Sequence, residues 1–64
     1  MTDGERLAAF EKMYQNIRER YADTERKMEA LKAQGKSKSA TFRQLMGEKL
    51  TLKNMLSMYE LYGL

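Results

Sequence analysis

The spacing of apolar residues in the first half of the chain most constrains its fold. Between residues 7 and 31, large apolar side chains recur at steps of three and four, with one step of seven. This is the a/d pattern of a helix that buries one seam, whereas a strand would need strict alternation. Thr2 and Glu5 have the spacing of a capping box at its start. The pattern predicts a helix over about residues 3–33, with the seam Leu7, Phe10, Tyr14, Ile17, Tyr21, Met28 and Leu31.

A second helix follows a short polar turn. Gly35 comes soon after the last seam residue and predicts a left-handed helix stop. Either Ser37 or Ser39 can cap the next helix, which we expect over about residues 39–62. The turn then lies at about residues 34–38. We therefore expect the whole chain, 1–64, to form a single helical-hairpin domain.

The two helices are expected to pair antiparallel, because so short a connection forces neighbouring helices to reverse direction. Facing positions in such a pair have a constant index sum. A sum of 73 sets apolar residues opposite one another along the hairpin, such as Tyr14 opposite Tyr59 and Leu31 opposite Phe42. The one polar seam residue, Thr24, falls opposite Lys49. The sequence thus predicts an all-α fold, a two-helix antiparallel hairpin.

The second helix carries more apolar surface than one hairpin can cover. A chain of 64 residues buries too little for secure stability, and this one has no cysteine or histidine for a disulfide or zinc site. Self-association is the remaining way to stabilise it. We expect a homo-oligomer, in the first place a dimer forming a four-helix bundle, with Gly47 allowing close backbone approach. The predicted interface residues are Phe42, Met46, Leu50, Met55 and Met58.

Nothing in the sequence predicts chemistry. There is no histidine or cysteine, no Gly-rich phosphate loop and no Asp/Asn-rich calcium loop, and the acids alternate with bases as on a solvated helix. We expect no enzyme activity, no catalytic residue, no cofactor and no metal. The polar N-terminus and the lack of an apolar run near 18 residues predict neither a signal peptide nor a membrane span, and hence a cytoplasmic protein.

The basic turn offers an alternative function. Lys36, Lys38 and Arg43 are the candidate phosphate contacts of a small accessory nucleic-acid-binding protein. A solvated loop with cations at a helix C-terminus explains the same residues more simply. The favoured prediction is therefore a non-enzymatic, self-associating protein–protein interaction module, whose further partners, if any, are proteins.

Two resemblances accompany this prediction. Residues 38–47, 54–59 and 62–64 resemble small uncharacterised helical proteins of gut Firmicutes, some of them associated with mobile elements, which imply no mechanism. The hairpin shape also resembles the sporulation-type aspartyl-phosphate phosphatases of bacilli and clostridia, whose second helix ends in Ser-x-x-x-Asp. Here Ser57 is followed by Leu61 at the acidic position, so the resemblance covers shape and does not extend to phosphatase activity.

Overall fold

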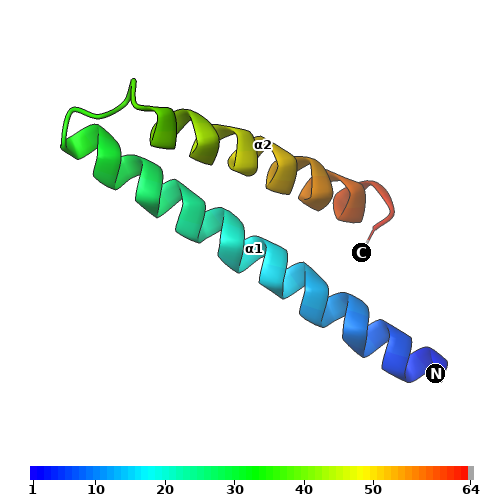
Figure 1. The fold of residues 1–64 in the computed structure, drawn as a ribbon. Coiled ribbons are helices and arrows are strands. Elements are labelled where there is room, and N and C mark those ends of the chain that lie inside the picture. Colours follow the sequence, from blue (N-terminus) through cyan, green and yellow to red (C-terminus); the bar gives the residue numbers. More distant parts are fainter. Residues whose placement is uncertain (64) are drawn as a thin grey trace.

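The computed structural model describes residues 1–63 as two antiparallel helices joined by a short turn (Figure 1). Helix α1 spans Asp3–Ala33 and helix α2 spans Ala40–Leu61. No strand occurs among these 63 residues. The hairpin measures 49 × 17 × 15 Å, so it is only two helices thick. The predicted all-α two-helix hairpin is confirmed, with helix ends within one residue of those expected.

Side-chain caps fix the start of each helix. The Thr2 hydroxyl accepts a hydrogen bond from the Glu5 backbone N–H at 3.2 Å. The Ser39 hydroxyl accepts one from the Phe42 backbone N–H at 3.1 Å, so Ser39 rather than Ser37 caps α2. Each bond satisfies a backbone donor that has no partner within the helix.

Gly35 ends α1 in the predicted way. Its φ is +72°, in the left-handed region that glycine adopts without steric cost. The Gly35 N–H donates to the Lys32 carbonyl at 3.0 Å, and the Lys36 N–H donates to the Leu31 carbonyl at 2.8 Å. These two bonds are the Schellman arrangement, which turns the chain back toward α2.

The core follows the predicted register. Leu52, only 1% exposed, packs with buried Ile17 and Tyr59. The rings of Tyr14 and Tyr59 lie 5.0 Å apart between centroids, tilted by 51°, which is a favourable aromatic geometry. Tyr14, Tyr21 and Leu56 cover this cluster, and Met28 and Phe42 are buried nearer the turn.

The polar layer is built differently from the expected pair. Thr24 is buried, but its hydroxyl donates to the carbonyl of Arg20 on its own helix at 2.8 Å. Lys49 instead reaches Glu25 across the hairpin at 3.8 Å. A second cross-helix pair joins Arg20 to Glu48 at 3.7 Å. The layer therefore satisfies its own polar groups and presents no unpaired charge to a ligand.

Candidate functional site

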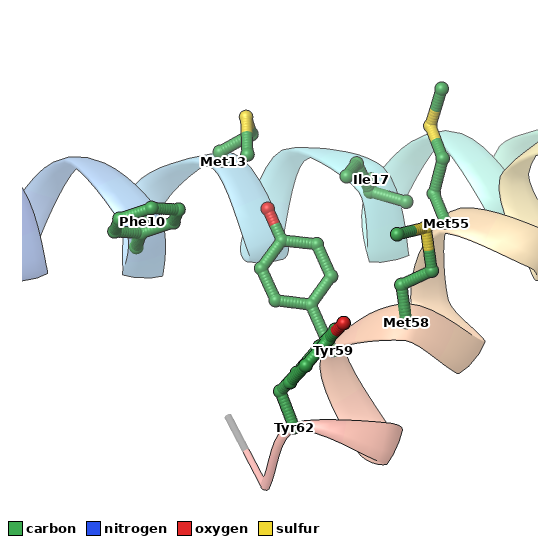
Figure 2. Close-up of a pocket in the computed structure, with 7 residues that line it drawn as sticks. All are labelled: Phe10, Met13, Ile17, Met55, Met58, Tyr59 and Tyr62. Atoms are coloured by element: carbon green, nitrogen blue, oxygen red, sulfur yellow. The ribbon is translucent and has the colours of Figure 1, made fainter.

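An apolar groove lies between the helices at the open end of the hairpin, away from the turn (Figure 2). Its volume is about 350 Å³, within the range of small-molecule and peptide sites. Both helices contribute side chains to it. We call it the open-end groove, and its lining residues are Phe10, Met13, Ile17, Met55, Met58, Tyr59 and Tyr62.

The two helices are unequal in length, and α1 continues past the groove. Helix α1 has 31 residues and α2 has 22, so the first turns of α1 extend beyond the end of α2 (Figure 1). Leu7 and Phe10 continue the α1 seam into this overhang, where little of α2 lies opposite them. Both side chains are therefore exposed, although their spacing is that of core residues.

Tyr59 gives the groove an unsatisfied polar group. The side chain is 8% exposed, and its hydroxyl has no hydrogen-bond partner among residues 1–63. Figure 2 shows the ring rising from α2 with the hydroxyl directed toward α1. A buried hydroxyl without a partner costs about 1–3 kcal/mol, and such groups are rare in native proteins. The spacing of Tyr59 predicted burial, but no sequence signal indicated that its hydroxyl would lack a partner.

The structure corrects one predicted interface residue. Phe42 is 5% exposed and lies in the hairpin interior, so it offers no surface to a second chain. The reason is already contained in the register, because Phe42 falls on the seam opposite Leu31. The other four predicted residues are exposed: Met46, Leu50, Met55 and Met58.

Those four residues do not form one surface. Met55 and Met58 line the open-end groove, whereas Met46 and Leu50 do not. Nine positions separate Met46 from Met55, which is two and a half helical turns, so the two side chains leave α2 on opposite sides. The structure instead brings Met55 and Met58 together with Phe10 and Met13 of α1, which the predicted interface did not include.

The predicted phosphate contacts lie at the other end of the hairpin. Lys36 and Lys38 are in the exposed turn and Arg43 is exposed near the start of α2. Within the described residues, none of the three takes part in an ion pair. The nearby ring of Phe42 is buried, so it is not available to stack on a base. Phosphate binding by this turn stays a prediction.

No arrangement for acid–base or metal chemistry is found in residues 1–63. No three acidic side chains there come together as metal ligands. Lys27 donates a hydrogen bond to Asp23 at 3.2 Å, and this bond, more than the Lys27 charge, lowers the pKa of the Asp23 carboxyl. That is an ordinary exposed i,i+4 pair. Neither helix has an apolar stretch of the length that crossing a membrane requires.

Comparison with known proteins adds no relative. No protein-family model, curated protein or solved structure matches this chain.

Proposed function

We propose that this chain is a non-enzymatic interaction module that associates with a second copy of itself through the open-end groove. The observation that carries the proposal is the balance of apolar side chains. Five hydrophobic residues are buried among those described, whereas ten large ones stay exposed. A hairpin that leaves more large apolar side chains outside than inside gains from a partner that covers them.

The solvent-accessible surface area of the hairpin supports an interface of ordinary size with a second copy. The chain exposes 5270 Å². A compact folded protein of 7.5 kDa is expected to expose about 4,200 Å². The excess of about 1,000 Å² is close to the roughly 800 Å² that each partner contributes to a standard interface. A second copy packed on the groove would remove the excess and form a four-helix bundle where the copies overlap.

The groove is a better interface than the surface of α2 around Met46 and Leu50. On a helix surface, neighbours lie three or four positions away. Around Met55 and Met58 these neighbours are uncharged: Thr51, Leu52, Asn54, Tyr59, Leu61 and Tyr62. Met46 and Leu50 instead have Arg43, Lys49 and Lys53 at three positions' distance. Covering that face would desolvate several cations, whereas covering the groove desolvates almost none.

The test compares one charge placed on each face. Met58 is 60% exposed and Leu50 is 56% exposed, so aspartate at either position should cost a single hairpin similarly little. We expect the wild type to form dimers and Met58→Asp to raise the dissociation constant at least about 100-fold, because association would bury an unpaired carboxylate. Leu50→Asp should change it little. Sedimentation equilibrium measures the mass, and circular dichroism checks that each variant stays helical.

Two results would contradict the proposal. One is a wild-type protein that is helical and monomeric throughout the micromolar range. The other is dimerisation that Met58→Asp leaves intact while Leu50→Asp abolishes it, which would move the interface to the surface of α2 around Met46 and Leu50.

A further inference from the structure

The buried hydroxyl of Tyr59 is not explained by the single hairpin. Its polar atom is shielded from solvent and has no partner among residues 1–63. A phenylalanine at this position would fill the same space without the desolvation cost. A tyrosine here makes physical sense if another molecule supplies the missing hydrogen bond when the groove is covered.

The groove itself offers a single chemical candidate for that bond. Of its seven lining residues, only Tyr59 and Tyr62 carry a hydroxyl group, and the methionine sulfurs are weak acceptors. Tyr62 is the C-cap of α2 and is 72% exposed, and within its own chain it does not bond the Tyr59 hydroxyl. Figure 2 shows the Tyr59 ring crossing from α2 toward α1, whereas the Tyr62 ring stays beside α2 with its hydroxyl near the start of the Tyr59 side chain. Because most of its side chain is exposed, Tyr62 can turn outward and contact a second molecule.

Two-fold symmetry would make a contact between Tyr62 and the second copy occur twice. In a symmetric dimer the same patch meets itself, so a residue that enters the other copy's groove receives its equivalent in return. We propose that in this dimer the Tyr62 hydroxyl of each copy hydrogen-bonds to the buried Tyr59 hydroxyl of the other. This inference rests on the proposed function, because it needs the dimer to form through the groove. Met13 of α1 also lines the groove and is half-exposed. Its unbranched side chain can move aside at small cost to admit the phenol.

Tyrosine-to-phenylalanine variants test the bond because they remove one oxygen atom and keep the ring. Tyr62→Phe should weaken the dimer about tenfold, since each dimer loses two bonds and keeps two buried hydroxyls unpaired. Tyr59→Phe alone should weaken the dimer to a similar extent, and combining the two changes should cause no further loss. The bond is already gone in either single variant, and the unpaired Tyr59 hydroxyl is buried in the free hairpin as well. This non-additivity is the signature of a direct contact. Tyr21→Phe, outside the groove, is the matched control and should leave the dimer unchanged.

The outcomes separate this inference from the proposed function. If the wild type does not dimerise, the proposed function fails and this inference with it. If the wild type dimerises and Tyr62→Phe binds as tightly as Tyr21→Phe, only the reciprocal bond is overturned. If Tyr59→Phe alone leaves the dimer as tight as the wild type, the hydroxyl is unpaired in the dimer as well, and the inference is again overturned.

Discussion

Two leucines that are two positions apart on α2 differ almost completely in exposure. Leu52 is nearly inaccessible between Ile17 and Tyr59, whereas Leu50 projects into solvent. Replacing Leu52 by alanine should destabilise the protein by about 2–5 kcal/mol through lost burial and the cavity left behind. Leu50→Ala should cost under about 1 kcal/mol. Urea unfolding at one fixed protein concentration measures both, and equal midpoints for the two variants would show that the register is wrong.

At the residue scale, sequence spacing predicts which side chains face the core. It does not predict hydrogen bonding that depends on atoms from other parts of the chain. The index sum of 73 set Tyr14 opposite Tyr59, and the rings are in contact. The same sum placed Phe42 on the seam, yet it was also assigned to the interface, and only one of these assignments could hold. The unpaired hydroxyl of Tyr59 depends on every atom around it, so no pattern along the chain could indicate it.

At the scale of the elements, two glycines perform opposite roles. Gly35 has a left-handed φ of +72°, whereas Gly47 lies inside α2, and a Cβ built there meets nothing within 4 Å. Gly47→Ala should therefore stabilise the protein by about 1 kcal/mol through helix propensity. Gly35→Ala should destabilise it by about 1–2 kcal/mol, because an L-residue is strained in that conformation.

Thermal unfolding followed by circular dichroism distinguishes the two glycine variants. A Gly47→Ala protein that is less stable, or that no longer dimerises, would show that a second backbone packs against Gly47. That result would favour the close approach expected from the sequence over contact through the groove.

Helix boundaries were predictable because caps and stops are local. Thr2, Ser39 and Gly35 act on backbone groups only a few positions away, so their effect can be recognised along the chain. The groove was not predictable in the same way. It combines side chains of α1 with two methionines of α2, and Met13 lies outside the seam that the spacing identified. The predicted interface residues therefore lie on α2 alone, whereas both helices line the groove.

At the scale of the whole molecule, the two ends of the hairpin differ in character. The turn carries the exposed cations Lys36 and Lys38, and both cross-helix ion pairs lie between the turn and the groove. The open end carries the apolar groove. An interface confined to the open end joins two such molecules there and leaves the basic turns far apart, where their like charges do not oppose association.

This asymmetry predicts an elongated dimer. Met13 of the groove lies 20 residues from the end of α1 at Ala33, which is about 30 Å along a helix. If the two-fold axis passes through the groove, the turns of the two copies lie roughly 60–70 Å apart. A dimer with full side-by-side overlap would instead be close to the 49 Å length of one hairpin. We therefore expect small-angle X-ray scattering to give a dimer with a maximum dimension well above 49 Å.

Spin labels supply the independent measurement, and the absence of native cysteine means that a single engineered one reports without background. A label at Ser37→Cys, in the exposed turn, should give an inter-copy distance near the roughly 60–70 Å expected between the two turns. A label at Asn16→Cys, on α1 next to the groove, should give a much shorter distance. A short distance at Ser37→Cys would place the turns together in a parallel dimer. A scattering dimension near one hairpin length would indicate a fully overlapped bundle. Either result would exclude the elongated dimer joined at its open ends. The basic turn of one copy would then lie against the other copy, and the interface would cover charged as well as apolar surface.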